Sequence, residues 1–184
     1  MLGVIEVPHV AIIVGSDSDL PIIKGAADVF EEFDVSYELT VASAHRTPKR
    51  VMELACDAEE QGVDVIIAAA GGAAHLPGFI AAFTTLPVIG LPIKSGALDG
   101  LDALYSIVQM PPGIPVATVG INNAKNAALL AIAILGVVDG DLRTKLHEFR
   151  KKMACAVNDK AMHLEELGIR GYLAEKEKNG PHPA

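Results

Sequence analysis

The chain has 184 residues, of which 51% are hydrophobic and 21% charged, and its formal net charge is −8. The length fits a single domain, and the negative charge provides no basic field that would attract nucleic acid. This composition is apolar for a small soluble protein, so we expect the chain either to enter a membrane or to bury surface in an oligomer.

Residues 9–136 alternate between short apolar runs and stretches in which apolar residues have helical spacing. This alternation predicts strands at 9–14, 35–41, 64–70, 87–91 and 116–120, and helices at 20–33, 48–61, 76–83, 101–108 and from Asn122 or Asn123 to about Gly136. Repeated strand–helix units are typical of a parallel sheet with helices on both faces. Right-handed crossovers favour the strand order 2-1-3-4-5, so we expect a flavodoxin-like, three-layer α/β domain.

Residues 65–93 contain no Asp, Glu, Lys or Arg, and a membrane-spanning helix needs only about 20 apolar residues. The same stretch, however, contains four glycines, three prolines and His75. These interruptions favour a buried strand, a glycine loop, a short helix and a second buried strand, as in parallel sheets that are covered on both faces. We therefore expect no membrane span.

The C-terminal part of the chain is expected to extend from a core at residues 9–137, with everything in one domain of residues 1–184. Twelve consecutive apolar or glycine residues at 127–138 predict a helix that is buried on all sides. Residues 139–174 are predicted to form a long amphipathic helical arm, which packs on its own sheet or reaches a neighbouring copy. Residues 175–184 are polar and predicted to be frayed.

Neither secretion nor a disulfide framework is expected. Residues 1–8 contain Glu6 and no basic segment typical of a secretory signal, so the predicted location is cytoplasmic. Cys56 and Cys155 show no metal or redox spacing, and Cys56 falls in a predicted helix, where we expect it to be a small core residue.

The first of three polar loops, residues 15–19, follows the first predicted strand. In open α/β sheets, ligands bind outside the carboxyl ends of the strands. The hydroxyls of Ser16 and Ser18, with the amides of a helix start, suit a phosphate, and Asp19 suits ribose hydroxyls. An ordinary helix N-cap would explain only one of these residues.

The second loop, residues 43–48, contains Ser43, His45 and Arg46 after the second predicted strand. A guanidinium can pair with a phosphate, and an imidazole can exchange protons near neutral pH. The third loop, residues 70–78, has two adjacent glycines, which let backbone amides approach a flat ligand. A simple turn with His75 capping the next helix is the ordinary alternative there. Both histidines, however, would lie at the same edge of the sheet.

No cluster has metal-ligand spacing, so no metal site is expected. The residues alone indicate an oligomeric α/β protein that binds a phosphorylated sugar. Five stretches together add a resemblance that covers about residues 9–150. They are residues 15–19 (GSDSD), 43–48 (SAHRTP), 70–78 (AGGAAHLPG), 106–111 (SIVQMP) and 126–130 (NAALL).

In combination these motifs resemble the 5-(carboxyamino)imidazole ribonucleotide mutase family of purine (IMP) biosynthesis. The resemblance implies an isomerase that moves a carboxylate from the exocyclic nitrogen to ring carbon four of one ribonucleotide, by decarboxylation and recarboxylation in a closed pocket. It also implies a flavodoxin-like fold, a homo-octamer, and no metal or organic cofactor. Two alternatives stay open: a direct carboxylase that uses free CO2, and a non-catalytic nucleotide-binding module.

By match of motif, the resemblance implies that His45 carries protons, that Asp19 binds the ribose hydroxyls, and that Ser16, Ser18, Ser43 and Arg46 hold the phosphate. Residues 71–76 would line the pocket for the ring and the carboxylate. The implied substrate-binding set is Ser16, Ser18, Asp19, Ser43, Ala44, Arg46, Gly71, Gly72, Ala73, His75 and Leu76.

Overall fold

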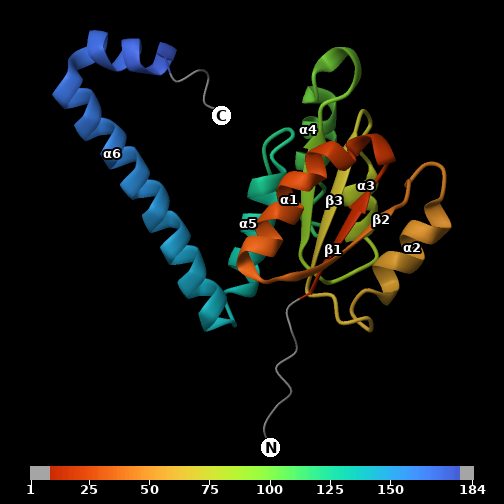
Figure 1. Ribbon diagram of the computed structural model, residues 1–184. Coiled ribbons are helices and arrows are strands. Elements are labelled where there is room, and N and C mark those ends of the chain that lie inside the picture. The colour runs from red at the N-terminus through yellow and green to blue at the C-terminus, as the bar shows by residue number, and fades with distance from the viewer. Residues whose placement is uncertain (1–8, 179–184) are drawn as a thin grey trace, which may run out of the picture. The chain divides into compact units, whose positions relative to one another are not determined.

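A computed structural model describes residues 9–178 of the chain (Figure 1). The chain divides into two compact units at the junction between Arg143 and Thr144. The first unit contains the whole sheet, and the described part of the second unit is helical.

The sheet has five parallel strands in the order β2-β1-β3-β4-β5, which confirms the predicted topology. Its central strands β3 and β4 are buried almost throughout, as expected when helices cover both faces of a parallel sheet. The strands are β1 (His9–Val14), β2 (Ser36–Val41), β3 (Val65–Gly71), β4 (Val88–Ile93) and β5 (Ala117–Thr118).

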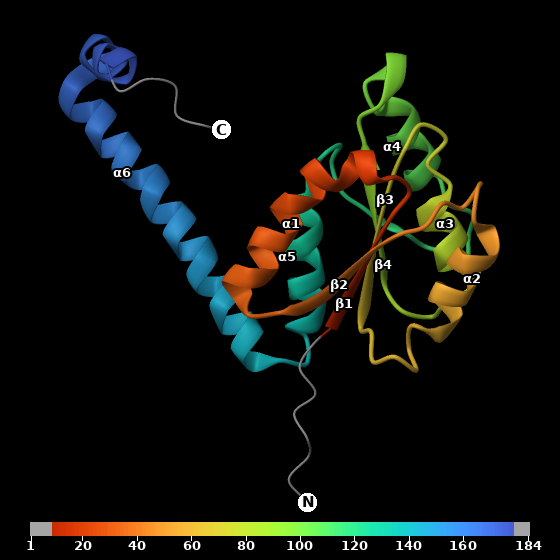
Figure 2. The ribbon, with the colours of Figure 1, turned by 45° about the vertical axis from the view of Figure 1, so that its right-hand side comes forward.

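Helices cover the sheet in two layers. Helices α1 and α5 pack against each other on one face, while α2, α3 and α4 cover the opposite face (Figures 1 and 2). The helical elements are η1 (Asp17–Asp19), α1 (Leu20–Phe33), α2 (Pro48–Asp57), α3 (Leu76–Ala81), η2 (Gly96–Leu98), α4 (Leu101–Val108), α5 (Ala124–Leu135) and α6 (Gly140–Lys178).

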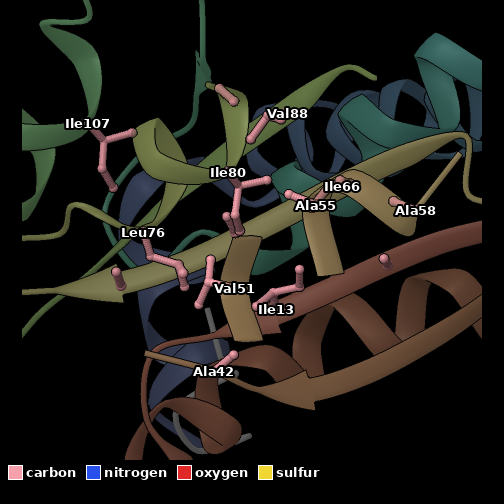
Figure 3. Close-up of a cluster of buried hydrophobic side chains, with 14 of the residues drawn as sticks. Ile13, Ala42, Val51, Ala55, Ala58, Ile66, Leu76, Ile80, Val88 and Ile107 are labelled. Carbon is pink, nitrogen blue, oxygen red and sulfur yellow. The ribbon is translucent and has the colours of Figure 1, made fainter. Parts of the chain in front are cut away.

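The core under α2, α3 and α4 is built from aliphatic side chains that alternate along the strands (Figure 3). Ile66 of β3, Ile80 of α3 and Ile107 of α4 are all completely buried in it. Alanines at positions 68 and 70 occupy the same face of β3, and their small side chains let the helices approach the sheet closely. This packing explains how a chain with so few aromatic residues fills its interior.

Residues 65–93 form β3, a loop, α3 and β4, which confirms the prediction of two buried strands in place of a membrane segment. Among the described residues, no helix combines the length and the apolar character that crossing a membrane requires.

Several predicted boundaries differ from those of the structure. Helix α2 ends at Asp57, four residues before the predicted end at residue 61, and residues 58–62 continue as hydrogen-bonded turns that close where Gly62 adopts a positive φ of 78° and the Val63 N–H bonds to the Ala58 carbonyl. Strand β4 continues through Pro92 to Ile93. Pro92 lacks an N–H, but its carbonyl accepts a hydrogen bond from Asn122, which keeps it in the strand.

The expected core position of Cys56 is wrong, and the expected burial of residues 127–138 is incomplete in the single chain. Helix α5 ends at Leu135, and Val137 and Val138 beyond it are 75% and 92% exposed. The burial of this end of the apolar stretch depends on an assembly and stays a prediction. Cys56 is exposed, since the buried face of α2 carries Val51 and Ala55 and the next position points away from the sheet.

Helix α6 extends to Lys178 and is broken at Gly168, whose φ of 62° and ψ of 168° are not helical. Across the break, His163 Nε2 and Glu175 Oε2 lie 2.6 Å apart. Residues 175–178 of the predicted frayed tail are therefore helical. The rest of that tail lies outside the described residues, as do residues 1–8, on which the expectation of no secretory signal rested.

Gly90 in β4 is predicted to be essential for packing. A Cβ at this position would lie 2.3 Å from Ile107 Cγ2 and 2.9 Å from Val116 Cγ1. We expect Gly90→Ala to lower the free energy of unfolding by about 1–3 kcal/mol, measured by urea denaturation. Gly120→Ala is the control, because its Cβ would meet nothing closer than 3.8 Å. Equal stability of the two variants would contradict this packing.

Candidate active site

The loops that follow β1, β2, β3 and β4 meet around one cavity of about 380 Å³ at the carboxyl edge of the sheet. The residues that line it are Gly15, Ser16, Ser18, Asp19, Ser43, Ala44, His45, Arg46, Ala70, Gly71, Ala74, His75, Leu76 and Ser95. Side chains that are up to about 80 positions apart in the sequence therefore share one pocket, as the parallel topology requires.

Ten of the twelve residues that the sequence suggested for the site lie in this lining, and their individual roles stay predictions. Gly72 and Ala73 do not line the cavity: Gly72 turns the chain with a φ of 63°, and Ala73 is exposed. The cavity is also lined by Ala74, which lies within the expected stretch 71–76, and by Gly15, Ala70 and Ser95, to which the sequence assigned no individual role. Ser95 follows β4, so the same rule about the carboxyl ends of strands would have found it.

The loop after β1 presents two hydroxyls to the cavity. The Ser18 N–H donates to Ser16 Oγ over 3.3 Å, and the two hydroxyl oxygens lie 3.0 Å apart. Ser16 caps η1, which leads directly into α1. Paired hydroxyls beside the start of a helix form a polar surface that can bind an anionic group.

Asp19 is the one buried charged side chain among the described residues, with 8% of its surface exposed. Burial raises the pKa of its carboxyl above the usual value, and the nearby Asp17 charge raises it further. Hydrogen bonds from the Ser18 hydroxyl and the Ser16 backbone oppose this rise without cancelling it. Burial destabilises the ionised form of this carboxyl, so its presence in the wall of a cavity makes it a candidate ligand-binding group.

The loop after β2 is held by reciprocal bonds between its two ends. The Thr47 hydroxyl accepts from the Ser43 N–H over 2.9 Å, and the Thr47 N–H donates to the Ser43 carbonyl over 2.8 Å. Thr47 therefore stabilises this loop and makes no side-chain cap on α2. The result is a fixed turn that presents His45 and Arg46 to the cavity.

Arg46 connects two of the loops. Its Nη2 donates to the Gly15 carbonyl over 3.1 Å, and its backbone N–H donates to Ser43 Oγ over 3.2 Å. A guanidinium carries five N–H donors, so several stay available for an anion beside the serine pair. Arg46, Ser16 and Ser18 thus give the β1–β2 side of the cavity the character of a phosphate site.

His45 and His75 meet in the wall of the cavity. Nε2 of His45 lies 2.7 Å from Nδ1 of His75, and the two rings form an edge-to-face pair with centroids 4.8 Å apart. One shared hydrogen joins the two facing nitrogens, so the tautomer of one ring sets the tautomer of the other. In either arrangement a proton can be added to a free ring nitrogen while this bond persists. The pair is therefore suited to accepting and returning one proton.

No group of three or more His, Cys, Asp or Glu side chains between residues 9 and 178 is arranged to hold a metal ion. The chemistry that the described cavity offers is thus an anion site, a buried carboxylate and a pair of imidazoles. These groups suit the binding of a phosphorylated sugar and a proton transfer beside it.

Comparison with known proteins adds to this geometry. Residues 9–156 match the family described as AIR carboxylase. The chain is 62% identical to the N5-carboxyaminoimidazole ribonucleotide mutase of Pyrococcus horikoshii and 57% identical to that of Thermotoga maritima, in each case over 92% of this chain. These matches cover 96% and 99% of the two relatives. The crystal structure of Treponema denticola PurE superposes with a TM-score of 0.77 at 30% identity, covering 85% of this chain and 98% of that one.

The raised pKa of Asp19 leads to a prediction about stability. The folded protein binds this proton more tightly than the unfolded chain does, so stability falls as the pH rises from the usual carboxyl pKa of about 3.9 through the folded value. The amide that replaces the carboxyl in Asp19→Asn does not ionise, so the variant should not lose this stability as the pH rises. The free energy of unfolding of Asp19→Asn relative to the wild type should therefore increase between acidic and neutral pH. Thermal unfolding at a series of pH values measures the difference.

Asp28→Asn is the matched control, because Asp28 is an exposed aspartate on α1 in a surface ion pair with Lys24. Its stability relative to the wild type should not improve on going to neutral pH. If the difference between Asp19→Asn and the wild type stayed constant with pH, the explanation by burial would be wrong.

Proposed function

The chain belongs to the AIR carboxylase family, and from this premise we propose how its pocket carries out the reaction of its named relatives. The enzyme is an isomerase of purine biosynthesis. It converts 5-(carboxyamino)imidazole ribonucleotide to 4-carboxy-5-aminoimidazole ribonucleotide. The observation that carries the assignment is the cavity that brings an anion site and a pair of imidazoles together, in a chain 57–62% identical to mutases over nearly their whole length.

The phosphate of the substrate binds on the β1–β2 side of the cavity. Arg46 provides the positive charge there, and the hydroxyls of Ser16, Ser18 and Ser43 provide donors. Asp19 stands next in the chain and accepts hydrogen bonds from the ribose hydroxyls. A ligand of this kind also explains why an ionisable carboxyl is kept in a buried position.

The carboxylate moves in two steps. Cleavage of the carbamate C–N bond releases CO2 and leaves an electron pair on the nitrogen, which takes up a proton. Ring carbon four then attacks CO2, and the new C–C bond leaves that carbon with both a hydrogen and a carboxylate until one proton departs. One proton is taken up and one released, so the reaction balances as an isomerisation and consumes no co-substrate.

His45 is the proton carrier in this scheme. A single imidazole can give the proton to the nitrogen in the first step and take the proton from carbon four in the second. Its hydrogen bond to His75 fixes the ring orientation and the tautomer between the two steps. Small groups at the ends of β3 and α3, including Gly71, Ala74 and Leu76, form a confined wall that holds CO2 close to the ring.

We further propose that the active form is a homo-octamer in the cytoplasm. Large apolar side chains are unusually exposed on the single chain, among them Val138 at 92%, Val137 at 75% and Ile169 at 70%. Such surface is normally covered by a partner. Eight copies is the assembly implied by the family resemblance, and sedimentation analysis of the full chain measures it.

The fate of the carboxylate tests the function. With substrate labelled at the carbamate carbon, in unlabelled bicarbonate, a mutase should keep most of the label in its product. A direct carboxylase would instead take its carboxylate from the free pool and give unlabelled product. A non-catalytic nucleotide-binding module would bind the substrate and form no product above the uncatalysed rate.

His45→Asn is predicted to cut turnover by about a hundredfold or more, because it removes the proton carrier. Nucleotide binding should stay largely intact, since other residues, Arg46 and the three serines, are proposed to bind the phosphate. Steady-state rates and calorimetric binding measure the two effects. Full activity of the variant would refute the assignment of His45.

Arg46→Ala is predicted to give the opposite pattern, with substrate affinity weakened by about tenfold or more through the loss of a charged hydrogen-bond donor to phosphate. Arg50→Ala is the matched control. Arg50 lies on α2 outside the cavity and bonds to Thr40. Unchanged affinity in Arg46→Ala, or an equal loss in both variants, would count against a phosphate role for Arg46.

A further inference from the structure

Ser95 is the one residue that the loop after β4 contributes to the lining of the cavity. It occupies the N-cap position of η2, but its side chain makes no capping hydrogen bond. Nor does its hydroxyl bond to any other group in the part of the chain that the structure describes. The cavity therefore contains a free hydroxyl that the assigned phosphate, ribose and proton-transfer roles do not use.

The neighbouring strand leaves room for this side chain. A Cβ on Gly71, at the end of β3, would lie 2.7 Å from Ser95 Oγ and 3.1 Å from Ser95 Cβ. Gly71 has an ordinary negative or extended φ, so glycine is needed here for space and not for a special backbone conformation. Its absent side chain lets Ser95 reach the cavity wall.

The residue before Ser95 is held in place from two sides. The Lys94 N–H donates to Asn122 Oδ1 over 2.8 Å, and Lys94 Nζ lies 3.0 Å from Asp99 Oδ1. The Asn122 N–H in turn donates to the Pro92 carbonyl in β4. These bonds fix the start of the loop to β4, so the position of Ser95 follows from the fold.

The strand order gives the direction in which a nucleotide lies. The anion site belongs to the loops after β2 and β1, whereas Gly71 ends β3 and Ser95 follows β4 on the other side of the cavity. A ribonucleotide whose phosphate binds at Arg46 therefore extends its base towards β3 and β4. Ser95 is thus placed at the end where the carboxylate changes its position on the ring.

We propose that Ser95 binds the migrating carboxylate, donating a hydrogen bond to one of its oxygens and keeping released CO2 against the ring. This inference rests on the function proposed above and adds a residue to it. A hydroxyl suits this task because it can donate to the carboxylate of the substrate, to CO2 and to the carboxylate of the product with little movement. The backbone amides near Gly71 do not provide a donor that can rotate in this way.

The test compares Ser95→Ala with the wild type in the labelled-substrate assay. We expect catalytic efficiency to fall by about ten- to a hundredfold, the effect of losing one hydrogen bond to a charged group. We also expect a larger share of the label to escape into the free CO2 pool, with aminoimidazole ribonucleotide released in place of product. Because Ser95 is exposed, the variant should fold normally, which its thermal unfolding verifies.

Ser36→Ala is the matched control, since Ser36 begins β2 at the opposite edge of the sheet. It should retain both rate and label like the wild type. A Ser95→Ala variant with unchanged rate and retention would overturn the proposal, and so would one with a lower rate but unchanged retention. A wild type that forms no product would instead reject the proposed function, and the role of Ser95 with it.

Discussion

The parallel direction of all five strands is the constraint on which this molecule depends. Because every strand points the same way, each connection from strand to helix begins at one edge, and four of these connections meet around a single cavity. The strands themselves contribute little beyond aliphatic packing. Binding and chemistry are concentrated in short loops whose ends are fixed by buried β-structure, which is the usual arrangement when a rigid scaffold positions reactive groups.

Within that cavity, two contacts connect loops that are distant in sequence. Arg46 bonds to the Gly15 carbonyl, and His45 bonds to His75. The loop after β2 is thereby joined to the loop after β1 on one side and to the loop after β3 on the other. Neighbouring residues in one turn thus organise the anion site and the proton-transfer site at a fixed separation.

Much of this arrangement could be predicted from the sequence, because it follows from periodicity and from the rule about carboxyl ends of strands. The strand order and the three polar loops at the carboxyl edge are of this kind, whereas the choice of single lining residues such as Ala44 and Leu76 came from the family resemblance. Details inside irregular turns could not be predicted, because a turn has no hydrophobic periodicity. The sequence therefore gives no sign that Gly72 and Ala73 lie outside the cavity lining. The contact between His45 and His75 depends on side-chain positions that only the folded loops define.

Element ends were the other weak point. The end of α5 at Leu135 agrees with the predicted end at about Gly136, whereas α2 ends at Asp57, four residues before its predicted end. Ser95 follows β4 and so lies where the rule about carboxyl ends of strands applies, but only the folded structure shows that its hydroxyl occupies the space above Gly71.

The break in α6 at Gly168 has a consequence for the end of the chain. A residue with φ near 62° and ψ near 168° interrupts the ladder of backbone hydrogen bonds, so the direction of the following turns is not inherited from the preceding helix. That direction is set by side chains instead, through the contact of Glu175 with His163 and the edge-to-face contact of Tyr172 with the same imidazole. His163 therefore contacts the helical segment beyond Gly168 at two residues. The backbone conformation at position 168 is one that glycine alone adopts readily.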